Sequence, residues 1–215
     1  MINKSEIKEF LDEKYYKYNT PEFIETDPIQ IPHRFTKKKD IEAAAFLSST
    51  IAWGNRKSII KSADYMLSLL ENEPYDFIRN SSIKDINNIQ KFVHRTFNTD
   101  DFIFYIRALK NIYTRFKSLE NIFYEGFSAG NSVYNALKYF REIFLQTNHQ
   151  KRSEKHLPNV VKNSAAKRLN LFLMWMVRHD KFGVHFGIWD KIPKSKLMLP
   201  LDVHAGNTAR NLGLL

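Results

Sequence analysis

Apolar side chains recur every three to four positions along most of the chain. Residues 5–17 carry Ile7, Phe10, Leu11 and Tyr15 on one helical face, which predicts a first helix there. The same spacing predicts further helices at about 40–53, 57–71, 98–116, 118–125, 131–146, 164–179 and 202–213. Alternation of apolar and polar positions, which marks half-buried strands, is weak throughout. The pattern therefore predicts an all-α protein.

Two of these helices differ from the amphipathic rest. The segment 41–53 has small residues on most sides and a single charge, which is typical of a central helix closely approached by its neighbours. From Leu169 to Val177 the chain is almost entirely apolar, so we expect that helix to be the buried axis of its lobe.

Polar stretches indicate where the chain divides. Residues 18–38 are polar and marked by three prolines, and residues 147–163 are polar and basic with no helical pattern. We predict one domain over residues 1–215, built from two helical lobes that meet at a central cleft. The lobe boundaries are expected near residue 40 and at 147–163.

Composition narrows the possible functions. With 215 residues, of which 43% are hydrophobic, the chain can bury a sizeable core. It contains no cysteine, which excludes disulfides, cysteine-ligated zinc and iron–sulfur clusters. Its first residues do not resemble a signal peptide, and no apolar run is long enough to cross a bilayer. We therefore expect a cytoplasmic protein with no membrane partner.

Positive charge is concentrated in the last third of the chain. The formal net charge is +10, and residues 151–215 hold 12 Lys and Arg against 4 Asp and Glu. Such a basic region favours a polyanionic partner, with nucleic acid as the first candidate. Lysine-rich solvated faces would give the same count, so charge alone leaves both interpretations open.

Two segments of this basic third place a lysine and an aspartate in a distinctive context. The first reads SAAKRLN (164–170) and opens the apolar helix at Lys167. The second reads PLDVHAGNTARNLG (200–213), in which Asp202 can cap the last helix.

These segments resemble two signatures of the helix-hairpin-helix base-excision DNA glycosylases. In that superfamily an Asp-x-His run opens a helix that carries an arginine and ends in a Leu-Gly step. Its bifunctional members place a lysine at the start of the helix after the hairpin. Lys167 falls on that lysine, Asn170 on the asparagine after it, and Asp202 on the aspartate. A weaker match is AAAFLSST (43–50), which is similar to a helix near the start of those proteins.

The chain resembles an uncharacterised bacterial family related to these glycosylases more closely still. The shared runs are IPHRF (31–35), AWGNRK (52–57), FVHRTF (92–97) and SAAKR (164–168). The two resemblances together imply a DNA-glycosylase-like helical fold and base-excision activity, with abasic-site lyase activity through a lysine Schiff base.

Three features depart from the superfamily pattern. The stretch equivalent to the hairpin, 159–164, has no glycine, which argues against anchoring a DNA phosphate there. Lys167 and Asp202 are 35 positions apart, and residues 182–196 resemble an insertion. Only 13 residues follow Asp202, which is compatible with a C-terminally truncated member.

The resemblance assigns catalytic roles to Lys167 and Asp202. Base excision needs a nucleophile at the anomeric carbon and a carboxylate beside the developing positive charge. A neutral, desolvated Lys167 would displace the base, and an ionised Asp202 would orient or deprotonate the amine and stabilise the oxocarbenium. The base must leave the stack, and Trp53, Trp175 or Trp189 could sandwich it.

Further residues are candidates for contacts with double-stranded DNA. They are the polar and basic side chains of the quoted runs, namely Arg168, Asn170, His204, Arg210, Asn55, Arg56, His33 and Arg34. The histidines His33, His94 and His204 show no metal-ligand spacing. We therefore expect no metal and no cofactor, and we expect a monomer.

Two other functions stay open at this point. A non-catalytic nucleic-acid-binding module could keep the fold, and the missing hairpin glycines and short C-terminal segment favour it. A helical interaction protein with no nucleic-acid role is the third possibility. Taken singly, Lys167 is a surface lysine at a helix start and Asp202 is an N-cap.

Overall fold

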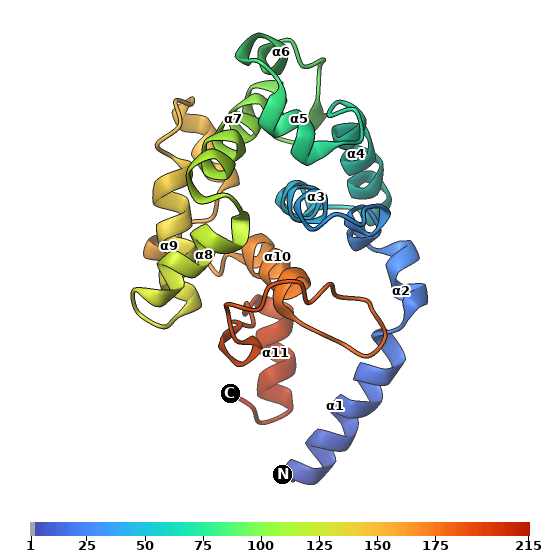
Figure 1. Cartoon of the computed structure of the whole chain (residues 1–215). Coiled ribbons are helices and arrows are strands. Elements are labelled where there is room, and N and C mark those ends of the chain that lie inside the picture. Colours follow the sequence, from blue (N-terminus) through green and yellow to red (C-terminus); the bar gives the residue numbers. More distant parts are fainter. Residues whose placement is uncertain (1–2) are drawn as a thin grey trace.

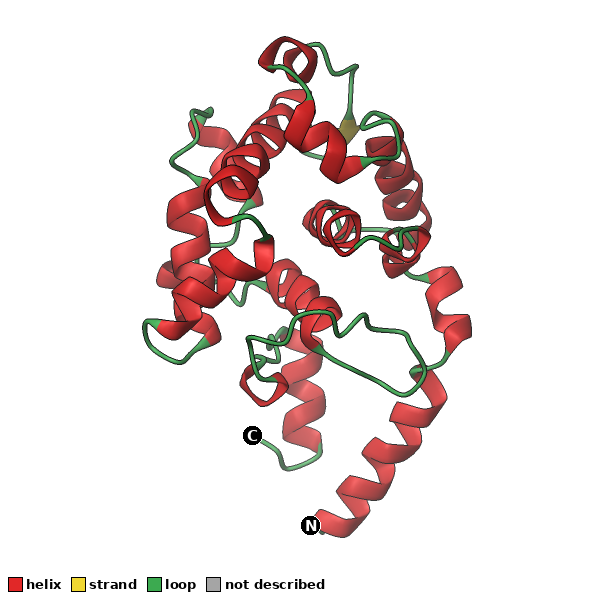
Figure 2. Cartoon of the chain, viewed as in Figure 1, coloured by secondary structure: helices red, strands yellow, loops and turns green. Residues whose placement is uncertain are grey.

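The computed structural model describes residues 3–215, whose regular structure is almost entirely helical (Figure 1; Figure 2). The α-helices are α1 (Lys4–Tyr18), α2 (Pro21–Thr26), α3 (Lys38–Thr50), α4 (Arg56–Ser68), α5 (Pro74–Asn80), α6 (Ile83–Asn87), α7 (Thr99–Phe116), α8 (Leu119–Ser128), α9 (Val133–Phe144), α10 (Lys167–Val177) and α11 (Val203–Asn211). Short 3-10 helices lie in the loops: η1 (Pro28–Gln30), η2 (Pro32–Arg34), η3 (Lys151–His156), η4 (Val160–Lys162) and η5 (Lys194–Lys196). The strands β1 (Val93–His94) and β2 (Phe97–Asn98) form a small antiparallel hairpin. The prediction of an all-α fold is confirmed.

Helix α3 lies at the centre of the fold. Figure 1 shows it end-on, with α4, α5, α7 and α10 around it. Every residue from Asp40 to Thr50 is buried, because the small side chains of 43–45 let neighbouring helices approach closely. The helix ends at Thr50 and not at Trp53 as the sequence indicated. Trp53 therefore lies in the loop to α4, where its side chain is only partly buried.

Helix α10 is the other central element. It packs against α3, and most of its residues are buried. Leu171 and Met174 are exceptions, since both are only partly buried. The apolar sequence of this helix thus serves two purposes: one side packs into the core, and the other borders a cavity described below.

The segment 147–163 is more ordered than its polar sequence indicated. It forms η3 and η4, and Ser153, His156 and Val160 are buried. The Arg141 guanidinium donates to the Leu157 carbonyl at 2.5 Å. A side chain from α9 therefore satisfies a backbone carbonyl of this segment. The segment is ordered by such polar contacts and not by a regular spacing of apolar residues.

The loop between α10 and α11 is also tightly held, although its first part looked like an insertion. The buried Asp180 carboxylate accepts hydrogen bonds from the backbone N–H of Phe182 at 2.9 Å and of His185 at 2.7 Å. The Trp189 indole N–H donates to Glu42 Oε1 at 2.9 Å. Glu120 Oε1 accepts from the backbone N–H of Asp190 at 2.9 Å. Three carboxylates therefore fix the path of the chain toward Asp202.

The buried apolar side chains form a connected core that extends from Ile29 to Ile192. Residues 18–38, expected to be a plain connection, contain α2, η1 and η2 and contribute Ile29 and Ile31 to that core. The division into two lobes near residue 40 and at 147–163 stays a prediction. Within residues 3–215, no helix has the length and apolar character needed to span a membrane.

Candidate active site

Lys167 and Asp202 meet at the start of α10. Lys167 is the first residue of that helix, and its amine donates to Asp202 Oδ2. Asp202 is the N-cap of α11, and its Oδ1 accepts a hydrogen bond from the Ala205 backbone N–H at 2.7 Å. Two helix starts, 35 positions apart in the sequence, thus bring the amine and the carboxylate into contact.

The electrostatics of the pair favour an ionised carboxylate. The Ala205 backbone N–H and the Lys167 amine together lower the pKa of Asp202 to about 2, so the carboxylate is charged at neutral pH. The Lys167 side chain is 55% exposed. The desolvation that the sequence led us to expect for this amine is therefore incomplete in the free protein.

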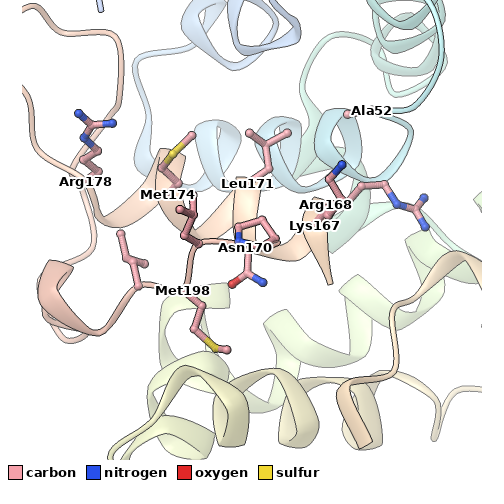
Figure 3. Close-up of a pocket in the computed structure, with 11 residues that line it drawn as sticks. Ala52, Lys167, Arg168, Asn170, Leu171, Met174, Arg178 and Met198 are labelled. Carbon is pink, nitrogen blue, oxygen red and sulfur yellow. The ribbon is translucent and has the colours of Figure 1, made fainter. Parts of the chain in front are cut away.

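A cavity of about 460 Å³ lies beside the pair. Its walls come from the partly buried side of α10 and from the run before Asp202: Ala52, Lys167, Arg168, Asn170, Leu171, Met174, Arg178, Leu197, Met198, Leu199 and Pro200. Figure 3 shows Met174 and Met198 projecting from these two segments, with Asn170 close to Met198. The volume is in the range of small-molecule sites, and the lining is mostly apolar with a few polar groups, as such sites require.

Asn170 provides an unpartnered acceptor in this wall. The residue is buried, with only 5% of its surface exposed. The Nδ2 atom donates to the Ala165 carbonyl at 3.0 Å, whereas Oδ1 has no hydrogen-bond partner among the described residues. An unpaired buried acceptor of this kind is costly, and it marks Asn170 as a polar group of the wall that its neighbours leave unsatisfied.

Arg168, the next residue along α10, takes a different direction. Figure 3 shows its guanidinium extending away from Met174 and Met198. It donates to the Thr50 carbonyl at the end of α3 and lies 4.6 Å from the centre of the Trp53 ring. These two contacts link α10 to α3 and to the Trp53 loop. The first is favourable because a cation at a helix C-terminus interacts well with the helix dipole.

Four of the predicted DNA-contacting residues have other partners and do not line the cavity. His33 Nε2 lies 3.0 Å from the Val184 carbonyl, and its ring packs on Phe186. Arg34 forms an ion pair with Asp64. Asn55 caps α4, since its Oδ1 accepts from the Ser58 N–H at 3.3 Å, and the Arg56 guanidinium lies 5.7 Å from the Phe23 ring.

The other two candidates lie on α11. His204 and Arg210 are both exposed, and Arg210 donates to Asn207 Oδ1 at 3.3 Å. They share a helix with Asp202 without contributing to the cavity wall.

Two of the three tryptophans proposed to sandwich a base cannot do so. Trp175 and Trp189 are fully buried in the core, so neither ring face is available. Sequence reasoning also missed the wall formed by Met174 and Leu197–Pro200. An apolar run outside any predicted helix, directly before Asp202, is the signal that could have revealed it.

Two residues just before Lys167 have left-handed backbone although neither is glycine. Asn163 has φ of 58° and Ala166 has φ of 47°, a conformation that favours glycine but that asparagine tolerates. Helix α10 then begins with no side-chain cap. The chain therefore enters α10 through two left-handed residues, Asn163 and Ala166.

No group of three or more His, Asp or Glu residues within residues 3–215 is arranged to hold a metal ion. The residues beside the cavity bring together an amine, a carboxylate and an amide.

Comparison with known proteins assigns a family but no activity. A family described as "Protein of unknown function (DUF2400)" matches residues 27–215. The chain belongs to this family. The match includes Lys167, Asp202 and every residue that lines the cavity. No curated protein and no solved structure matches the chain.

Proposed function

We propose that the protein is a base-excision DNA N-glycosylase and that Lys167 also gives it abasic-site lyase activity. The observation that carries the proposal is the contact between the Lys167 amine and the Asp202 carboxylate beside a largely apolar cavity. The resemblance of both segments to the glycosylase signatures gives these two residues their roles.

In the proposed reaction, the Lys167 nitrogen attacks C1′ of the sugar while the bond from C1′ to the base breaks. The base leaves with that electron pair and takes up a proton, and the amine loses protons to Asp202 or water. Opening of the sugar ring gives a Schiff base, from which elimination of the 3′ phosphate cuts the strand. Asp202, ionised at neutral pH, faces the positive charge that develops on the sugar.

The cavity supports a flipped base as the group that is bound. A base leaving the duplex loses its stacking neighbours, and the apolar side chains of Leu171, Met174 and Met198 offer replacement contacts. Asn170 adds an amide to the cavity wall, and an amide matches the polar edge of a base.

Borohydride trapping tests the proposal. Duplexes that carry an oxidised base, a deaminated base or an abasic site are incubated with the protein and borohydride, and covalent adducts are resolved on a denaturing gel. We expect an adduct with the wild-type protein and none with Lys167→Arg, which keeps the positive charge beside Asp202 without the primary amine. Lys162→Arg is the matched control, because Lys162 is an exposed lysine in the preceding η4.

The absence of any adduct from the wild-type protein, or an adduct that survives Lys167→Arg, would contradict the lyase activity. Base release without trapping would leave a glycosylase that uses water in place of Lys167.

A non-catalytic nucleic-acid-binding module is the second candidate. The half-exposed Lys167 side chain favours it, since a nucleophilic lysine is usually desolvated. This candidate predicts salt-dependent DNA binding with no base release, and no effect of Asp202→Asn on affinity.

A further inference from the structure

A second pocket shares Arg168 with the Lys167 cavity. It is lined by Trp53, Thr96, Lys155, His156 and Arg168 and has a volume of about 340 Å³. We call it the Trp53–Arg168 pocket. We propose that it binds a phosphate group, and that this phosphate belongs to the nucleic-acid strand whose sugar lies at Lys167. The second half of this statement rests on the proposed function.

The lining carries hydrogen-bond donors and no acidic side chain. Arg168 and Lys155 are cationic, Thr96 is an exposed residue that carries a hydroxyl, and His156 contributes an imidazole. Among the described residues, neither Arg168 nor Lys155 forms an ion pair. An unpaired guanidinium and an unpaired ammonium around one hollow are the groups that bind phosphate oxygens.

The guanidinium is held in place for such a contact. One of its NH groups donates to the Thr50 carbonyl, and its central carbon lies over the Trp53 ring, 4.6 Å from the ring centre. Arg168 uses NH1 for the Thr50 contact, so other N–H donors of the fork stay available. A cation already fixed on a ring loses little conformational entropy when a ligand binds.

Behind the pocket, His156 lies beside the buried Asp101 carboxylate, whose negative charge is compensated by other partners. Asp101 Oδ2 lies 3.3 Å from His156 Nε2, and Asp101 Oδ1 accepts from Ser153 at 2.5 Å and from Arg152 at 2.9 Å. Burial alone would raise the pKa of Asp101, but its contacts with His156 and Ser153 lower it to about 2. The Asp101 carboxylate is thus fully buried and paired with Arg152, so it does not repel an anion from the pocket entrance.

A further cation lies next to the pocket. The Arg95 side chain packs over Gly54, the residue after Trp53, since a Cβ on Gly54 would be 2.8 Å from the Arg95 guanidinium. The uncapped N-terminus of α10 adds the partial positive charge of its free backbone N–H groups. Arg168 lines both the Lys167 cavity and this pocket, so the proposal places the sugar of a strand at Lys167 and a phosphate of the same strand at Arg168.

Two measurements test the proposal. The first is a fluorescence titration with inorganic phosphate, thymidine, thymidine 5′-monophosphate and a single-stranded oligothymidylate. Trp53 is the partly exposed tryptophan, and Trp175 and Trp189 are fully buried, so a change in indole emission reports on this pocket. The second is the salt dependence of binding to a duplex with an uncleavable abasic-site analogue.

Lys155→Gln and Thr96→Val probe the pocket from exposed positions. Lys151→Gln is the matched control, because Lys151 is exposed in the same η3 but does not line the pocket. We expect the phosphate-bearing probes, but not thymidine, to change the emission of wild type and Lys151→Gln, with a smaller change for Lys155→Gln. Lys155→Gln should also lower the salt slope by about 0.9, which is about a five-fold loss of affinity at 0.15 M salt.

The outcomes separate the alternatives. If the monophosphate binds but the strands do not, the phosphate site stands and its source is a free nucleotide. Equal effects of Lys155→Gln and Lys151→Gln, or equal responses to thymidine and its monophosphate, overturn the proposal. If phosphate binding survives while no base is released and no adduct is trapped, only the proposed enzymatic function fails.

Discussion

Replacing Trp189 with phenylalanine tests how strongly the core holds the loop that leads to Asp202. The indole N–H donates at 2.9 Å to Glu42, whose side chain is fully buried. Loss of this hydrogen bond leaves a buried acceptor oxygen unpaired, which costs about 1–3 kcal/mol. The smaller ring also leaves a void between Phe123 and Phe172, which costs on the order of 1 kcal/mol. We expect Trp189→Phe to lower the free energy of unfolding by about 3 kcal/mol.

Urea unfolding followed by circular dichroism measures this change directly. For a chain of this size, the loss corresponds to a fall in melting temperature of roughly 6–12 °C. The double variant Glu42→Leu with Trp189→Phe removes both polar partners and should be more stable than Glu42→Leu combined with wild-type Trp189. A loss of less than about 0.5 kcal/mol for Trp189→Phe would refute the anchoring role, because surface substitutions give changes of that size.

The same contact has a pH signature. Burial raises the pKa of Glu42, and the Trp189 N–H opposes that rise. A carboxyl whose folded pKa lies above its unfolded value of 4.5 stabilises the fold fully below that value. This stability is lost as pH rises through the folded pKa. Trp189→Phe removes a contact that lowers the pKa, so its deficit should be larger at pH 7 than at pH 4.

Three further predictions concern the site and the helix packing. Met174→Trp should fill the cavity and slow base release more than it slows trapping on a preformed abasic site, measured as the ratio of the two rates; equal slowing would argue against a base in this cavity. Asp202 has a depressed pKa of about 2, so its stabilisation of α11 is present above its ordinary value of 3.8 and is lost as pH falls through about 2; amide exchange at Ala205 measures it, and constant protection down to pH 1.5 would contradict the cap. Gly126→Ala should cost about 1–3 kcal/mol, because the new Cβ would be 2.6 Å from the Tyr139 Cβ and 3.0 Å from the Ala136 Cα; unchanged urea unfolding would show that α8 and α9 can separate.

The elements with a strong local signal were predictable from sequence. Asn98 and Asp101 form the capping box that begins α7. Asp202 caps α11, as its position directly before the predicted last helix indicated. The central position of α3 followed from its small residues and single charge. These features depend on contacts between residues three to four positions apart, which a linear pattern records.

The parts that escaped prediction depend on long-range polar contacts. Nothing in the periodicity of 147–163 shows that Arg141 and Asp101 will satisfy that segment. Likewise, His33 has the appearance of a ligand-binding residue in sequence, yet its partner is the Val184 carbonyl. A buried carboxylate or a half-buried histidine often has a single partner that is distant in the sequence. The position of that partner relative to it is defined only by the folded structure.

The meeting of Lys167 and Asp202 combines both kinds of information. Each residue lies at a helix start, which the sequence could identify. Their contact, however, depends on the path that the chain takes through the 35 positions between them. Glu42 and Glu120 hold the middle of that span to α3 and α8. Loosening that hold should therefore affect the site at a distance: Trp189→Phe, which changes no residue of the cavity wall, should still weaken the Lys167–Asp202 contact and reduce borohydride trapping. Full trapping by a variant destabilised by about 3 kcal/mol would show that the run from Leu197 to Asp202 is positioned by its own packing on α10 and not by the anchored loop.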